Sequence, residues 1–142
     1  MNRDAEIFNL YKYFIWSDRM RTSYDAIIDQ RVEEMVFDVK FEIETNLYMS
    51  YWFSSLYVVI EGWKELGMKD ERVDALLHSR HVKLLRRYRN GVFHFQRDYF
   101  DERFMGFFRD GIDRLDWIRR LHMEFESYFY RWANEHRGFL GW

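Results

Sequence analysis

Apolar side chains recur at helical spacing along most of this chain of 142 residues. In residues 5–16, and again from Thr22 to about Phe37, they follow one another at steps of three and four, so they share one face of a helix. No proline or glycine separates the two stretches, which could therefore form a single long helix. The pattern predicts amphipathic helix over the N-terminal part of the chain.

Residues 38–44 break this pattern, because polar and apolar side chains alternate there. Alternation is the period of a β-strand. One short run cannot build a sheet by itself. We therefore expect an extended connection at residues 38–44, with a short edge strand as the less favoured alternative.

The next segment, from Thr45 to Ile60, contains no charged residue. It is too short, and too rich in serine and tyrosine, to cross a membrane, which takes about 20 apolar residues. It predicts a central buried helix over about residues 45–66, with its N-cap at Thr45 or Asn46. Two glycines are expected to mark the end of this helix, Gly62 and Gly67.

The rest of the chain continues the helical pattern in separate pieces. Asp70–Leu77 predicts a short helix, and Ser79 to about Gln96 places basic residues around an apolar stripe. The segment of residues 98–108 is short and rich in aromatic side chains, and Asp110-Gly111 is typical of a turn. A long amphipathic helix is expected from Ile112 to near Gly138.

Composition and length narrow the fold class. Hydrophobic residues make up 48% of the chain and aromatic residues 21%, which excludes intrinsic disorder. Together with the helical pattern, this predicts an all-α fold, an up-and-down helical bundle of about five helices in a single domain over residues 1–142. The chain has no cysteine, which excludes disulfides and thiol chemistry. The first residues lack the apolar core of a signal peptide, so we expect a cytoplasmic protein without a membrane partner.

The net charge of −2 conceals one strongly basic segment. Residues 1–78 carry 9 basic and 15 acidic side chains, whereas residues 79–97 carry six basic side chains and no acidic one. Arginine can bind a phosphate group with two parallel hydrogen bonds, which lysine cannot, so an arginine-rich segment favours a polyanionic partner. The alternative is a solvated helix face whose cations pair with neighbouring acids. The candidate RNA-binding residues are Arg80, Lys83, Arg86, Arg87 and Arg97.

Most familiar catalytic patterns are absent from the sequence. There is no glycine-rich phosphate loop and no His-Glu-x-x-His. His78 and His81 are three residues apart, but no third ligand accompanies them, so we predict neither a metal nor a cofactor.

The remaining candidate is the run Arg89-Asn90-Gly91-Val92-Phe93-His94, within the basic segment. Arginine followed by histidine at this distance is weak evidence, since Arg131 and His136 have the same spacing. The asparagine directly after Arg89 makes the run more specific.

This run resembles the Arg-(polar)-x3-His motif of the HEPN superfamily, whose members are small helical bundles and include many metal-independent endoribonucleases. The apolar run from Tyr51 to Trp63 resembles the second main helix of that family, and Leu84 to Asn90 resembles the approach to its motif. The resemblance covers about residues 45–100. It implies a homodimer that joins two motifs in one cleft, and a toxin or defence effector, with an antitoxin protein as a further partner. One toxin subgroup has a modifiable tyrosine two residues after the motif histidine. Here that residue is Gln96, so control by that modification is not expected.

The three motif residues suit RNA cleavage by the 2′-hydroxyl group. The imidazole of His94 can take or give a proton, Arg89 can stabilise the phosphorane charge on the non-bridging oxygens, and Asn90 can orient His94 or the phosphate. On an ideal helix Arg89 and His94 lie about 140° apart, although Gly91 could permit a local irregularity. Two hypotheses follow: an endoribonuclease, or a non-catalytic helical module that binds nucleotide, RNA or a protein. The second would have Arg89 paired with Glu61 and His94 satisfied by a carboxylate, but Glu61 could also support Arg89 in an enzyme.

Overall fold

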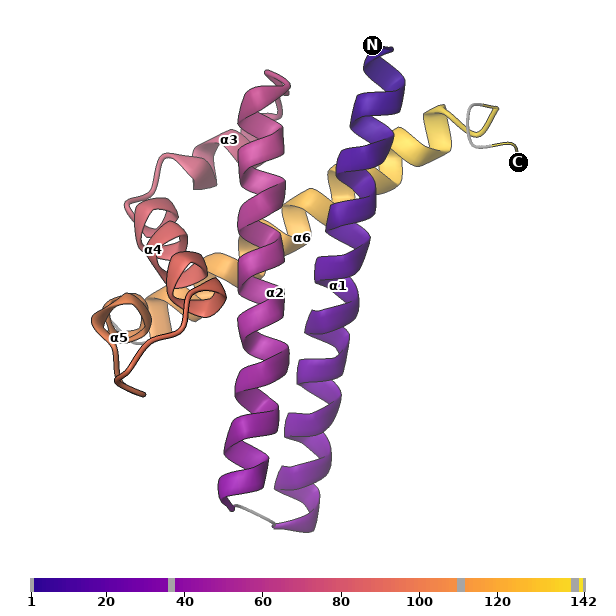
Figure 1. Cartoon of the computed structure of the whole chain (residues 1–142). Helices are drawn as coiled ribbons and strands as arrows, with labels where there is room; N and C mark the ends of the chain where they lie inside the picture. The colour runs from indigo at the N-terminus through magenta and orange to yellow at the C-terminus, as the bar shows by residue number, and fades with distance from the viewer. Residues whose placement is uncertain (1, 36–37, 110–111, 139–140, 142) are drawn as a thin grey trace.

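The computed structural model describes residues 2–35, 38–109, 112–138 and 141, and in these ranges it contains helices and no strand (Figure 1). The all-helical prediction is therefore confirmed at this level. The turn expected at Asp110-Gly111 lies outside the described residues. The described residues form six helices, compared with the five or so expected: α1 (Arg3–Glu34), α2 (Val39–Glu65), α3 (Glu71–Leu77), α4 (His81–Phe93), α5 (Glu102–Phe108) and α6 (Ile112–Glu135).

The two N-terminal stretches form one continuous helix, α1, of 32 residues. The side chain of Asn2 caps its first turn by accepting a hydrogen bond from the backbone N–H of Asp4 at 2.9 Å. The helix ends at Met35, whose φ of 58° is left-handed.

The prediction of an extended connection at residues 38–44 is wrong, because Val39 already begins α2. Asp38 is the N-cap, and its carboxylate accepts a hydrogen bond from the backbone N–H of Phe41 at 2.8 Å. No strand lies among the described residues to pair with this segment, so the backbone satisfies its hydrogen bonds within the helix. The predicted caps Thr45 and Asn46 thus lie inside α2.

The predicted end of α2 is right at one glycine and wrong at the other. Gly67 follows the helix with a left-handed φ of 62°, where a side chain would be strained. Gly62 instead lies inside α2, directly against Leu10 of α1, and a Cβ atom there would collide with that leucine. The antiparallel helices α1 and α2 also meet where Ser17 donates a hydrogen bond to the carbonyl of Trp52 at 3.0 Å (Figure 1).

The core lies where α6 crosses the pair of α1 and α2 obliquely (Figure 1). Phe14, Leu56 and Phe125 represent the three helices in it, with exposed fractions of 3%, 0% and 0%. The N-terminal half of α2 extends beyond the core, so Ile43 and Leu47 are exposed. The prediction of a buried helix over about residues 45–66 is therefore wrong at Leu47.

Helices α4 and α5 pack beside α2, on the side away from α1 (Figure 1). Gly91 of α4 lets the ring of Phe104 approach closely, since a Cβ atom at Gly91 would lie 2.9 Å from that ring. Gly91 is helical, so it serves close packing and not the local irregularity considered above.

No helix in the described ranges combines the length and the apolar character needed to cross a bilayer.

Candidate functional site

The three motif residues lie near the C-terminal end of α4. Arg89 and Asn90 are partly buried on the helix, and His94 is its C-cap, with extended backbone angles (φ −125°, ψ 128°). The helix therefore ends just before His94, and the ideal helical angle between Arg89 and His94 does not apply. His94 is exposed to solvent.

Arg89 makes its contacts towards α2. Its guanidinium forms an ion pair with Glu61, and its Nε donates a hydrogen bond to the Oδ1 atom of Asn90 at 3.2 Å. The guanidinium carbon also lies 4.8 Å from the ring centroid of Tyr57, a cation–π distance. The pair with Glu61 that the sequence suggested is thus present. It holds Arg89 in one orientation and offsets part of its charge.

His94 has surroundings of a different kind. Within the described residues, its imidazole has no hydrogen bond and no ion pair, so the carboxylate partner considered from the sequence is not there. It lines a cavity of about 490 Å³ between α2, α4, the connection after α4, and α5. Neither Arg89 nor Asn90 lines this cavity. In one chain, therefore, the structure joins Arg89 with Asn90 and Glu61 but does not join either with His94.

Two hydroxyl groups meet on the wall of this cavity. The hydroxyls of Ser50 and Tyr88 are 3.1 Å apart, and Tyr88 is almost completely buried. Burial raises the pKa of Tyr88 to about 12, so its phenol stays neutral at physiological pH. The interior of the cavity can therefore offer hydrogen bonds without a charge from Tyr88.

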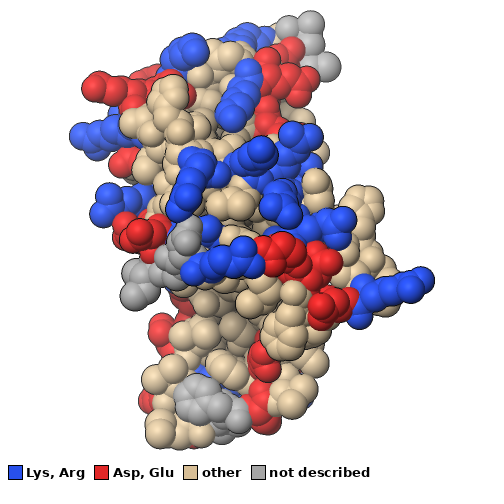
Figure 2. Space-filling view, turned by 90° about the vertical axis from the view of Figure 1, so that its left-hand side faces the viewer, with Lys and Arg blue, Asp and Glu red and all other residues tan. Residues whose placement is uncertain are grey.

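The five basic residues predicted to bind RNA are all exposed. Figure 2, which shows the side of the molecule that carries α4, has Lys and Arg side chains gathered across its middle. Among the described residues, no ion pair joins Lys83, Arg86, Arg87 or Arg97 to a carboxylate. The alternative of a helix face neutralised by neighbouring acids is not supported for these four.

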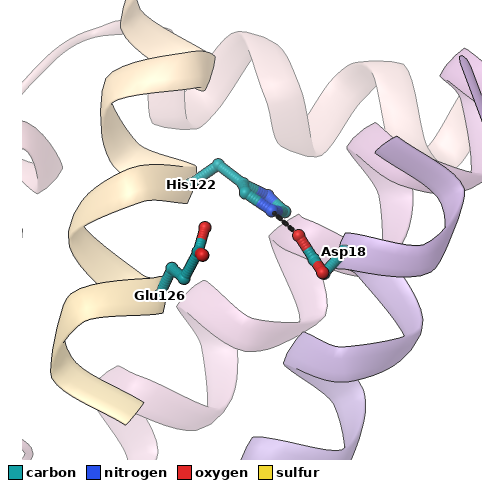
Figure 3. Close-up of side chains that lie close together, drawn as sticks. All are labelled: Asp18, His122 and Glu126. Atoms are coloured by element: carbon teal, nitrogen blue, oxygen red, sulfur yellow. Dashed lines mark hydrogen bonds and ion pairs between the residues drawn. The ribbon is translucent and has the colours of Figure 1, made fainter. Parts of the chain in front are cut away.

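A second cluster of titratable groups, which the sequence analysis did not identify, lies between α1 and α6. Nε2 of His122 lies 2.9 Å from Oδ1 of Asp18, and Glu126 approaches the same point (Figure 3). Ligand atoms of the three residues lie within 4.8 Å of one another, and no other such group with metal-ligand chemistry occurs in the described residues. His78 and His81 are thus not part of a metal-binding group there.

The protonation of His122 makes this cluster a poor metal site. Nδ1 of His122 accepts a hydrogen bond from the indole N–H of Trp52 at 3.2 Å, and an indole can only donate. The neutral ring therefore carries its proton on Nε2 and donates it to Asp18. A metal on Nε2 would need that proton moved to Nδ1, where it would face the proton of Trp52. Trp52, His122 and Asp18 fit a chain of hydrogen bonds better than a metal centre, and Glu126 is exposed beside them.

Electrostatics agree with a neutral His122. Burial lowers its pKa, against the opposing influence of Asp18. Burial alone would raise the pKa of Asp18, but hydrogen bonds from His122 and Arg21 bring it below its ordinary value. The one local signal in the sequence was the spacing of four between His122 and Glu126, which places both on one face of α6.

Comparison of the chain with protein families, curated proteins and solved structures gave no match. Its function is therefore inferred from its own residues.

Proposed function

We propose that this protein is a metal-independent endoribonuclease of the HEPN type, which cleaves RNA through the 2′-hydroxyl group. The observation that carries the proposal is the position of His94. Its unpartnered, exposed imidazole ends the helix that also bears the exposed cations Lys83, Arg86 and Arg87. An imidazole that can act as an acid or a base then lies beside a surface suited to a phosphate backbone.

The chemistry assigns one role to each motif residue. In the first step the 2′-oxygen attacks phosphorus and loses its proton, and the bond to the 5′-oxygen breaks as that oxygen gains a proton. His94 serves one of these two proton transfers and a water molecule the other, while Arg89 stabilises the charge on the non-bridging oxygens. Two side chains position the guanidinium of Arg89: Asn90 accepts a hydrogen bond from it, and Glu61 forms an ion pair with it. The products are a 2′,3′-cyclic phosphate and a 5′-hydroxyl.

A homodimer completes the site in this proposal. Arg89 and His94 do not share a contact or a cavity within one chain, so the Arg89 of one protomer would act with the His94 of its partner. A two-fold axis near residues 79–97 would supply two such pairs. The proposal extends to a cytoplasmic toxin or defence effector, held in check by an antitoxin protein.

One observation favours a second function, a non-catalytic module that binds RNA, nucleotide or a protein. The Glu61 carboxylate already offsets the charge of Arg89, as it would in a purely structural pair. Such a module would use the cations of α4 for binding but would leave RNA intact.

The deciding experiment is incubation of the purified protein with mixed RNA in EDTA, followed by analysis of the new ends. We expect cleavage, with 2′,3′-cyclic phosphate ends. His94→Ala and Arg89→Ala should each abolish it. Arg89→Lys should retain little cleavage activity, because an ammonium group cannot make the two parallel hydrogen bonds of a guanidinium to phosphate.

Arg131→Ala and His136→Ala serve as matched controls, since this pair has the same spacing as Arg89 and His94. Arg131 is paired with Asp70 and His136 stacks on Trp132, so the melting temperature of each control is measured first. Intact RNA after incubation with wild type, or cleavage by His94→Ala at the wild-type rate, would refute the nuclease and favour the binding module.

A further inference from the structure

The cavity beside His94 has the character of a ligand site. Its volume of about 490 Å³ lies in the range of small-molecule pockets, and apolar side chains form most of its wall. Phe100, Phe104, Phe108 and Met49 contribute to this wall, together with Phe95, which is 93% exposed. Aromatic rings at the rim and inside suit a flat apolar ring as the occupant.

Three acceptors in the wall of the cavity have unused capacity, beside the donors that His94 and the hydroxyl pair of Ser50 and Tyr88 offer. The hydroxyl of Tyr99 donates to Oε1 of Glu42 at 3.2 Å and accepts from the amide of Asn46 at 2.9 Å. The second carboxylate oxygen of Glu42 and the amide oxygen of Asn46 are left without a donor among the described residues. Likewise, Asp98 uses Oδ1 to accept from the backbone N–H of Phe100 at 2.9 Å, and its Oδ2 is left over. N–H groups of a ligand can donate hydrogen bonds to these three acceptors.

The charge of the wall excludes phosphate from the cavity itself. Two carboxylates, Glu42 and Asp98, line it, and no lysine or arginine does. The cations lie outside the cavity, on the exposed face of α4. A neutral aromatic ring inside, attached to phosphates outside, matches this separation of charge.

We infer that the cavity binds one base of an RNA strand and favours the bases with an exocyclic amino group, adenine, cytosine and guanine, over uracil. Uracil has a single N–H between two carbonyl oxygens, which the carboxylates of Glu42 and Asp98 would repel. The inference rests on the proposed function for the identity of the ligand. It places the bound base next to His94, so the cleaved phosphodiester would adjoin an amino-bearing base.

Binding is tested apart from cleavage by using single-stranded DNA, which lacks the 2′-hydroxyl and is not cut. Tetradeoxynucleotides of adenine, cytosine or uracil, labelled at the 5′ end, are titrated with the full-length protein and followed by fluorescence anisotropy. We expect the adenine and cytosine tetramers to bind roughly tenfold more tightly than the uracil tetramer. Equal affinity for all three tetramers would overturn the inference.

The decisive variant is the double substitution Glu42→Gln with Asp98→Asn, which changes two acceptors into groups that can also donate. It should reduce or reverse the discrimination against uracil. The matched control is Asp29→Asn with Glu33→Gln, two exposed acids on α1, which changes the net charge equally and should preserve the wild-type preference. A double variant that discriminates as wild type does would also refute the assignment, provided its melting temperature is unchanged.

The two proposals fail in different ways. Base-selective binding of DNA without any cleavage of RNA would support base binding in the cavity and refute the proposed nuclease activity. Cleavage of RNA that depends on His94, but without a base preference in binding or at the cleaved bond, would refute base selection by the cavity and support the nuclease activity.

Discussion

The indole N–H of Trp52 donates to Nδ1 of His122 across 3.2 Å, and this bond determines which imidazole nitrogen carries the proton. The other nitrogen, Nε2, then donates to Asp18 at 2.9 Å, so that one chain of hydrogen bonds links α2, α6 and α1. His122 is 1% exposed. A second proton on its ring would face the Trp52 donor, and folding therefore favours the neutral form.

The stability of the fold should depend on pH through His122. Burial lowers its pKa from the ordinary value of 6.5, while Asp18 opposes this and the nearby cations Arg21 and Arg119 reinforce it. Below pH 6.5 the unfolded chain takes up a proton that the folded chain resists, so the free energy of unfolding falls as the pH drops and is fully regained above 6.5.

Urea unfolding at a series of pH values measures this effect. His122→Asn keeps an acceptor for Trp52 but cannot ionise, so its unfolding free energy should fall less than that of wild type below pH 6.5. The comparison is made well above 3.8, the ordinary pKa of Asp18, because the variant loses the His122 hydrogen bond that helps to lower that pKa. Identical pH profiles for the two proteins would show that His122 does not carry this dependence.

Gly91→Ala should separate α5 from α4. The new methyl group would lie 2.9 Å from the ring of Phe104 and 3.0 Å from Cβ of Arg103, closer than side chains normally pack. We expect a loss of about 1–3 kcal/mol in the free energy of unfolding. Gly106→Ala, on α5, is the control, because its methyl group would meet only Glu102 at an ordinary 3.6 Å. The control should be neutral or gain up to about 1 kcal/mol from helix propensity.

Leu56→Ala tests the position of the core. Leu56 is fully buried where α2 packs, so its truncation should cost about 2–5 kcal/mol in chemical denaturation. Leu47→Ala makes the same chemical change two and a half turns earlier on α2, where the side chain is 47% exposed, and should cost about 1 kcal/mol or less. Equal losses for the two variants would be inconsistent with this arrangement of α2.

The exposed cations of α4 should control the salt dependence of RNA binding. Each phosphate contact on a single strand contributes about 0.7 to the slope of log affinity against log salt. Replacing both Arg86 and Arg87 by alanine should therefore weaken binding and reduce that slope by about 1.4. The control replaces Lys12 and Arg19, which lie on α1 beyond α2, and should leave the slope unchanged. Nitrocellulose filter binding of a short single-stranded DNA, which lacks the 2′-hydroxyl and is not cut, over a range of salt concentrations measures both the affinity and the slope.

Local patterns in the sequence determined most of the helical structure. Steps of three and four between apolar residues predict a helix without knowledge of its neighbours, and α1, α3 and α6 follow that rule. The exposure of the basic residues on α4 also follows from the sequence, because Leu85 and Tyr88 supply the buried face and the arginines occupy the rest. The alternation at residues 38–44 is typical of a strand, whereas Asp38 caps a helix that begins at Val39. Among the described residues no strand is present to pair with this segment, so the helix forms.

The relations between side chains distant in the sequence came only from the tertiary structure. Asp18 and His122 are 104 residues apart, and no local pattern could pair them. Arg89 and His94 are five residues apart, yet they face different surroundings, because α4 ends at Phe93 and the chain turns towards the cavity while Arg89 faces Glu61 on α2. A local pattern determines which face of a helix is apolar, whereas the packing of helices determines which polar groups share a space. That packing depends on side-chain shape along the whole chain, as at Gly62 against Leu10 and Gly91 against Phe104.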